Sequence, residues 1–423
     1  MGNIEQAQTL VNEFSSMAAV GVLHLRHFPP PETVQQALNQ LQKRHPLLQM
    51  EITRQQGELS FVAVPDCPPL PLTVVDGAET DAWRMVVQEA INTQVPHQAP
   101  LLHFHYLQLA DDKVDLIVVF HHAMMDAFSG INLLEEMLLL LNGQGEALDA
   151  ELPFLQPCET YFPQALQGVR RLPKLARFMT AQMGDEFSYR VQSRNGRIPP
   201  IHQSATCIPL VRRLSVAETR ALSRAVREHD VTINGALSAA QLLAVHKYLY
   251  DNQALPLRTM IFANLRPYLQ PPIPKENLGC YITPTRQTVA MPAHPNFWQI
   301  AQTIQQNLTN TMRRGDGFLN ALMSRMLVKM ITGRGSERFA ATAISYAGPL
   351  PLRANYGAIE LLDMHAFLAS TPIGPEFFAF SHIFKGELIW DFAYLDADMD
   401  AAMANRIADE TCNLLIEASS FNA

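Results

Sequence analysis

A proline-rich segment near the middle of the chain most constrains how the protein can fold, because proline interrupts both helices and sheets. The segment spans residues 150–205, and its prolines are Pro153, Pro157, Pro163, Pro173, Pro199 and Pro200. Helix and strand patterns alternate on both sides of it, which is typical of α/β domains. We therefore predict two α/β domains, at 1–160 and 205–423, joined by a connector at 161–204 that includes one short helix.

Apolar spacing predicts the elements of the first domain. A helix is expected from Pro31 to about Arg44, followed by strands at 58–64 and 70–75 and a helix at 79–95. The apolar runs 101–109 and 114–120 are joined by turn-forming residues and predict a hairpin. A strongly apolar helix is expected at 130–142.

The second domain is predicted to begin with two helices and a strand. Ser215 followed by Glu218 forms a capping box, which predicts a helix over 215–229. A second helix is expected at 232–250 and a strand at 259–264.

Composition excludes several classes of protein. The chain has 423 residues, 48% of them hydrophobic and 17% charged, so it can fill large cores and is not intrinsically disordered. Its net charge of −8 disfavours a nucleic-acid binder, which needs a basic face. The five scattered cysteines suit neither a zinc site nor a disulfide framework. With no visible secretory signal or membrane-spanning run, we expect a cytoplasmic monomer.

The segment 118–130 carries the most informative chemistry. It runs from an apolar strand through His121 and His122 to Asp126, and then into the expected helix. Imidazole has an unperturbed pKa of about 6.5, so a small shift makes it a general base near neutrality. Asp126 suits two roles: it can orient a ring, as the acid does in hydrolytic triads, or pair with an arginine and lock the loop.

Two other interpretations of this segment stay open at this point. The paired histidines suit a satisfied edge of the core, with each ring hydrogen-bonded. A metal site is the second, because His103 and His105 share one face of the preceding strand. No HExxH spacing is present, and the carboxylates match no familiar metal site, so we predict no metal.

The stretch from His121 to Ala127 resembles the HHxxxDG motif of the acyltransferases with the chloramphenicol-acetyltransferase-like fold. That superfamily includes nonribosomal peptide synthetase condensation domains, Pap-type polyketide-associated acyltransferases, alcohol acetyltransferases and wax-ester synthases. Further segments resemble motifs of the group in the same order along the chain: 37–48, 100–102, 232–240, 264–267, 277–281 and 344–350.

The resemblance implies an α/β fold of two subdomains, each a mostly antiparallel or mixed sheet flanked by helices, in a pseudo-dimeric arrangement with a central tunnel. It implies that His122 is the general base and that His121 is a structural motif residue. It also implies that Asp126 pairs with Arg266. One departure is that the motif's glycine is Ala127 here. Further candidates for the tunnel or an oxyanion site are Ala127, Ser129, Ser345 and Gly348.

The implied function is transfer of an acyl group from a coenzyme A or carrier-protein thioester to a hydroxyl, in secondary metabolism or lipid or polyketide biosynthesis. Neither a covalent acyl-enzyme nor a permanently bound cofactor is implied. Basic residues within 170–197 and 313–338 are candidates to meet coenzyme A phosphates or an acidic carrier protein. The alternatives are a free-standing condensation domain that forms an amide, a non-catalytic member that binds a carrier protein, and a hydrolase.

Overall fold

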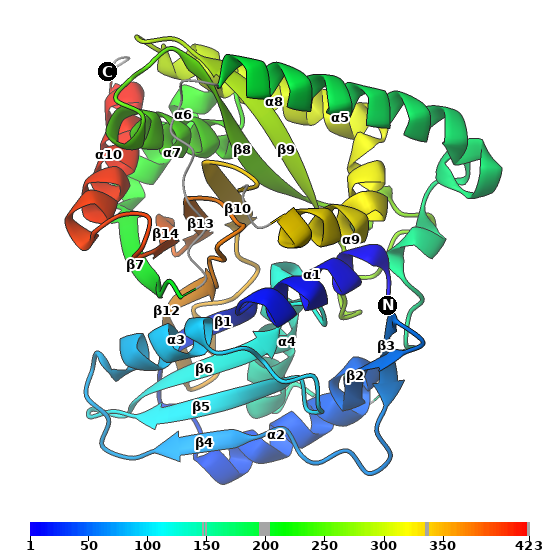
Figure 1. Cartoon of the computed structure of the whole chain (residues 1–423). Coiled ribbons are helices and arrows are strands. Elements are labelled where there is room, and N and C mark those ends of the chain that lie inside the picture. The colour runs from blue at the N-terminus through cyan, green and yellow to red at the C-terminus, as the bar shows by residue number, and fades with distance from the viewer. Residues whose placement is uncertain (146–147, 149, 194–203, 335–337, 421–423) are drawn as a thin grey trace. The chain divides into compact units, whose positions relative to one another are not determined.

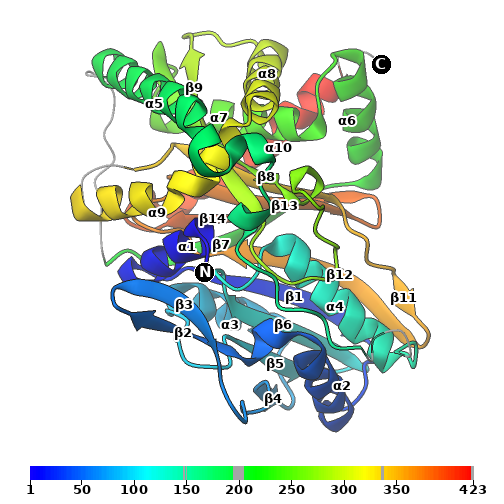
Figure 2. The same ribbon diagram turned by 90° about the vertical axis from the view of Figure 1, so that its right-hand side faces the viewer.

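The structure is a computed structural model, and it describes residues 1–145, 148, 150–193, 204–334 and 338–420. The chain divides into two compact units, each built around its own sheet (Figures 1 and 2). Unit 1 comprises residues 1–161, 271–281 and 350–369. Unit 2 comprises residues 162–270, 282–349 and 370–423.

Unit 1 contains a sheet with strand order β11-β12-β1-β6-β5-β4. All its neighbouring strands run antiparallel except β4 and β5, which are parallel. Its strands are β1 (Ala18–Arg26), β4 (Leu72–Val75), β5 (Leu102–Gln108), β6 (Lys113–His121), β11 (Asn355–Tyr356) and β12 (Ile359–Leu368). The remaining elements are α1 (Asn3–Phe14), α2 (Pro31–Arg44), η1 (Pro46–Gln49), the hairpin β2 (Met50–Gln55) and β3 (Glu58–Ala63), α3 (Ala82–Asn92), α4 (Ala127–Leu141) and η3 (Cys158–Tyr161).

Helices cover both faces of this sheet. A Cβ on Gly21 of β1 would meet Val118 of β6 and Leu134 of α4, so α4 packs on the face that carries Val118. On the opposite face, Trp83 of α3 packs edge-on against His24 of β1, with ring centroids 5.3 Å apart. Successive residues of a strand point to opposite faces, so His121, at the end of β6, lies on the α3 face.

Unit 2 contains a sheet with strand order β7-β14-β13-β10-β8-β9. Strand β10 runs parallel to both of its neighbours, and the other pairs are antiparallel. The strands are β7 (Cys207–Leu214), β8 (Leu255–Asn264), β9 (Ile282–Met291), β10 (Thr342–Pro349), β13 (Phe377–Phe384) and β14 (Glu387–Leu395). The helical elements are η4 (Gln164–Leu166), η5 (Gly168–Arg171), α5 (Leu172–Gln192), α6 (Val216–Glu228), α7 (Ile233–Leu249), η6 (Arg266–Tyr268), α8 (Phe297–Arg314), α9 (Asp316–Arg334) and α10 (Ala401–Ser420).

The core of unit 2 forms around α7, which is apolar nearly all round. Its leucines and small alanines are buried together with the side chains of β13 and β14. Trp390 and Phe392 of β14 stack there with ring centroids 5.2 Å apart, and both are fully buried. A helix that is apolar on every side belongs inside a core.

The predicted mixed α/β class, with helices flanking two sheets, is confirmed. The helix at Pro31–Arg44 and the hairpin of β5 and β6 lie where they were predicted, and the capping box of Ser215 and Glu218 is present. Helix α4 begins at Ala127, three residues before the predicted start at 130, because Asp126 caps it.

The course of the chain differs from a simple linear division. The first segment of unit 1 ends at Tyr161, next to the predicted boundary at 160, but the chain returns to unit 1 at 271–281 and 350–369. The short helix predicted in the connector is the 21-residue α5. Pro173 stands in its first turn, where the missing N–H removes no helical hydrogen bond. Residues 194–203, with Arg194 and Arg197 of the predicted basic cluster, lie outside the described residues.

Candidate functional site

The candidate site is the turn between β6 and α4. Strand β6 ends at His121, the turn follows from His122 to Asp126, and α4 begins at Ala127. Asp126 is the N-cap of α4, and its Oδ1 accepts a hydrogen bond from the backbone N–H of Ser129 at 2.9 Å. A carboxylate at this position satisfies an N–H group that has no partner within the helix.

Hydrogen bonds also hold this turn to residues 279–281. The second oxygen of Asp126 accepts from the backbone N–H of Tyr281 at 2.9 Å, and the Asp126 N–H donates to the Gly279 carbonyl at 3.1 Å. The Ser129 hydroxyl donates to the same carbonyl at 2.9 Å and accepts from the Gly279 N–H at 3.1 Å. Asp126 and Ser129 are fully buried, so the turn is fixed where water does not compete.

Gly279 is required by this arrangement. A Cβ built on it would lie 2.5 Å from the ring of Tyr281, which is closer than real contacts allow. Its φ of 157° is also uncommon for other residues. The position of the Tyr281 ring against residue 279 therefore depends on a residue without a side chain.

The hydrogen bonding of His122 fixes which ring nitrogen is free. Nδ1 of His122 lies 3.0 Å from the carbonyl oxygen of Met125, and a carbonyl only accepts, so Nδ1 carries the proton. In the neutral ring Nε2 is then the unprotonated nitrogen, and it has no hydrogen-bond partner among the described residues. Burial lowers the pKa of His122, while the Met125 carbonyl and Asp126 oppose that shift. His122 is therefore neutral at pH 7 and offers a lone pair at Nε2.

His121 has a different environment. Its Nδ1 accepts a hydrogen bond from the backbone N–H of Ala123 at 3.1 Å, so Nε2 carries the proton in the neutral ring. The His97 ring packs edge-on against it at 5.5 Å. Burial, followed by His97 and His122, lowers the pKa of His121 to about 3. This ring has no free lone pair, which suits a packing role.

The other candidates belong to different elements of the two units. Ala127 is the half-buried first residue of α4 in unit 1. Arg266 is buried at the start of η6 in unit 2, and its N–H donates to Asn264 Oδ1 at 3.0 Å. Ser345 is half-buried in β10, and Gly348 has a φ of 78° beside the register shift of that strand. The pairing of Asp126 with Arg266 stays a prediction.

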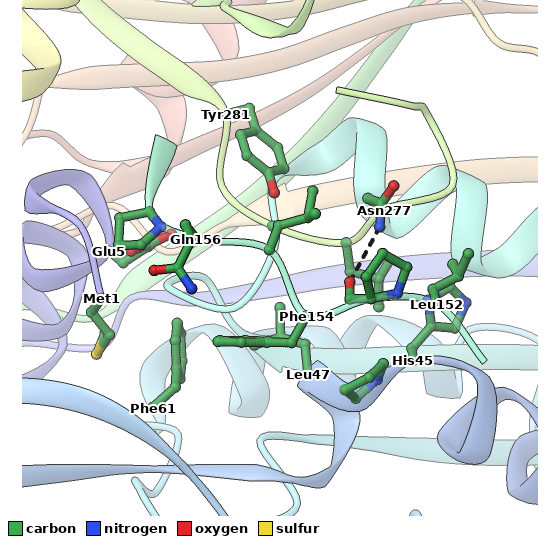
Figure 3. A pocket seen from close by; sticks show the side chains of 16 residues that line it. Met1, Glu5, His45, Leu47, Phe61, Leu152, Phe154, Gln156, Asn277 and Tyr281 are labelled. Carbon is green, nitrogen blue, oxygen red and sulfur yellow. Dashed lines mark hydrogen bonds between the residues drawn. The ribbon is translucent and has the colours of Figure 1, made fainter. Parts of the chain in front are cut away.

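A pocket that the sequence did not predict opens beside residues 277–281 (Figure 3). Its volume is about 560 Å³, which includes space that is open to solvent. Phe61 of β3 and Phe154 supply aromatic walls, and Gly279 and Tyr281 line it from the segment that holds the turn. Burial raises the pKa of Glu5, also in its wall, to about 7. Gly279 acts through its backbone N–H and carbonyl, so no side chain in the sequence signals its role. In the sequence, only the resemblance of residues 277–281 to a family motif pointed to this segment.

Among the described residues, no group of three or more His, Cys, Asp or Glu side chains is placed to hold a metal ion. His103 and His105 of β5 pack edge-on with centroids 5.1 Å apart, and burial lowers the pKa of His103 to about 4. In the same part of the chain, no helix has the length and apolar character needed to cross a bilayer.

Sequence comparisons place this geometry among known proteins. Residues 209–386 match the family described as phthiocerol/phthiodiolone dimycocerosyl transferase C-terminus. The azaphilone biosynthesis cluster protein M of Aspergillus terreus is 26% identical over 232 residues, which are 53% of this chain and 54% of that protein. Nonribosomal peptide synthetase 5 of Gibberella zeae is 29% identical over 126 residues, 29% of this chain and 1% of that protein. The chain thus matches about half the length of the first relative and a small part of the second.

Solved structures share the fold over nearly the whole chain. The trichothecene 15-O-acetyltransferase of Fusarium sporotrichioides has a TM-score of 0.76 at 14% identity and covers 99% of this chain and 95% of its own. Polyketide synthase associated protein 5 of Mycobacterium tuberculosis has a TM-score of 0.70 at 16% identity, with coverage of 99% and 98%. The first condensation domain of the CDA synthetase has a TM-score of 0.72 at 12% identity, with coverage of 100% and 96%. These structures confirm the predicted fold, and the family match over residues 209–386 agrees with the resemblance drawn from the motifs.

Proposed function

We propose that this protein is an acyltransferase of secondary metabolism that moves an acyl group from a coenzyme A or carrier-protein thioester to a hydroxyl acceptor. The observation that carries the proposal is the free Nε2 of His122, on a turn fixed by buried hydrogen bonds. The match of residues 209–386 to a transferase family supports acyl transfer. The shared fold of a 15-O-acetyltransferase supports a hydroxyl acceptor.

The proposed step uses His122 as the general base. The acceptor hydroxyl gives its proton to Nε2 while its oxygen attacks the thioester carbonyl carbon. A C–O bond forms, the C–S bond breaks, and the leaving thiolate takes the proton back from the imidazolium. General-base catalysis contributes about 10²–10⁴-fold, so positioning of both substrates supplies the rest. Asp126 acts here as a positioning residue, because it holds the turn and does not touch the reacting atoms.

The donor and acceptor are both substrates in this proposal, so no bound cofactor is required. We place the reaction in the cytoplasm and expect a monomer.

Amide formation by a free-standing condensation domain is a second candidate, supported by the fold shared with such domains. The same base would then take its proton from an amine. A non-catalytic member that binds a carrier protein would keep the fold without turnover, and Ala127 in place of the motif glycine supports that alternative.

The test follows free thiol release from a series of acyl-coenzyme A and acyl-pantetheine donors, with alcohol or amine acceptors and product detection by mass spectrometry. We expect ester formation, with His122→Ala at least about 100-fold slower than the wild type. His105→Ala, a half-buried histidine in the same sheet, is the matched control and should retain turnover. Unchanged turnover in His122→Ala would contradict the mechanism. Thioester binding without turnover in the wild type would favour the non-catalytic alternative.

A further inference from the structure

Helix α5 of unit 2 turns its acidic side chains toward the sheet. Arg258 of β8 is 5% exposed, and its Nη2 lies 2.8 Å from Glu186 Oε2 and 3.1 Å from Asp185 Oδ2. Arg286 of β9 lies 3.3 Å from the same Glu186 oxygen. The Arg258 guanidinium also stacks on the Tyr189 ring at 3.7 Å from its centroid. The two acids of α5 are therefore paired on the inward side of the helix.

The outward face of α5 is apolar. Leu172, Met183, Phe187 and Val191 are 56%, 69%, 73% and 47% exposed. At 3.6 residues per turn they fall within an arc of about 100° and extend along about 29 Å. Arg190 falls in this arc, but its Nε donates to Glu186 Oε1 at 2.8 Å. An apolar row of this length marks an interaction surface, and we call these four residues the α5 stripe.

Basic residues precede and begin the helix, at Arg170, Arg171, Lys174 and Arg177, and its first turn has no acid. A helix N-terminus carries partial positive charge, so cations there do not stabilise the helix. Arg177 pairs with Asp316 at 2.8 Å, but Arg170 and Lys174 make no ion pair among the described residues. In a chain of net charge −8, these cations need another explanation, and an anionic partner supplies one.

We propose that α5 binds an anionic lipid surface, with the α5 stripe inserted at the headgroup boundary and Arg170, which is exposed just before the helix, contacting lipid phosphates. A bilayer offers an apolar medium along the whole length of the stripe together with dense negative charge, which is the combination that this helix presents. Both views draw α5 as a long helix at the outer edge of unit 2 (Figures 1 and 2). This inference does not depend on the proposed acyl transfer.

The test is flotation of the full chain with vesicles of phosphatidylcholine alone or of phosphatidylcholine mixed with phosphatidylserine. We expect stronger binding to the anionic vesicles, decreasing with salt. The double variant Met183→Ser/Phe187→Ser should bind at least about tenfold more weakly. Arg170→Glu should weaken the preference for anionic lipid. Met85→Ser, on α3 of unit 1 and 72% exposed in the native chain, is the matched control and should bind like the wild type.

Three outcomes would overturn the proposal. The first is a wild-type chain that floats with neither vesicle. The second is a Met183→Ser/Phe187→Ser variant that floats like the wild type. The third is self-association of the wild type without vesicles, seen by analytical ultracentrifugation and lost in that variant, because the α5 stripe would then join two copies of the chain. Circular dichroism and the urea midpoint establish that each variant is folded.

Discussion

The carboxylates of the β6–α4 turn and of helix α5 have different kinds of partner. Asp126 accepts hydrogen bonds from the backbone N–H groups of Ser129 and Tyr281, so it fixes the path of two chain segments. Asp185 and Glu186 instead meet the side chain of Arg258, so they fix a helix against a sheet. Backbone donors set positions closely because they have no rotamers, whereas long side chains adapt. A reacting group needs the first kind of support, and a docked helix is served by the second.

The largest effect should follow removal of the backbone-bound carboxylate. Asp126→Ala removes the helix cap and leaves the buried Tyr281 N–H without this acceptor. We expect a loss of about 2–4 kcal/mol in the free energy of unfolding, measured by urea denaturation. Turnover should fall by about 100-fold, because the His122 ring is displaced.

Asp126→Asn is the informative companion variant, because its amide keeps one acceptor oxygen. It should recover part of the stability lost in Asp126→Ala. If Asp126→Ala unfolds at the wild-type urea midpoint, these hydrogen bonds do not hold the turn.

A smaller effect is expected from breaking the arginine pairing of α5. Arg258→Met removes a cation that both Asp185 and Glu186 meet. Glu186 keeps Arg190 and Arg286, and both acids are about one third exposed, so water compensates partly. We expect a loss of about 1–3 kcal/mol in the free energy of unfolding, with turnover close to that of the wild type. A loss of turnover as large as that of Asp126→Ala would show that the two regions are not separable in function.

The smallest effect is expected at Ser129. Ser129→Ala removes the hydroxyl that donates to the Gly279 carbonyl and accepts from its N–H, at a cost of about 1 kcal/mol. Ser345→Ala, a half-buried serine of β10, serves as the control and should change the urea midpoint less. Equal shifts for the two variants would mean that the Ser129–Gly279 contact adds nothing specific.

Local patterns predicted much of this molecule. The apolar run of β6, the two histidines and Asp126 are close in sequence, so spacing alone placed them at a strand-to-helix turn, although it did not identify Asp126 as the cap of α4. The capping box at Ser215 was visible for the same reason.

The return of residues 350–369 to unit 1 was not predictable in that way. Strand β12 pairs with β1, which lies more than 300 positions earlier in the chain, and nothing in the sequence of β12 indicates that partner. The role of Gly279 and Tyr281 was hidden because they act through backbone groups, which every residue has. The outward α5 stripe was not predicted from the sequence, because the acidic residues of α5 face inward, against the usual pattern of a surface helix.

The most direct test of the account is the pH dependence of kcat/KM for acyl transfer. Burial lowers the pKa of His122 below 6.5, and only the neutral ring accepts a proton at Nε2. We therefore expect more than half of the maximal kcat/KM to remain at pH 6.5, and an acid limb with its midpoint below that value that is absent from the residual activity of His122→Ala. A midpoint at or above 6.5, or the same acid limb in His122→Ala, would contradict it.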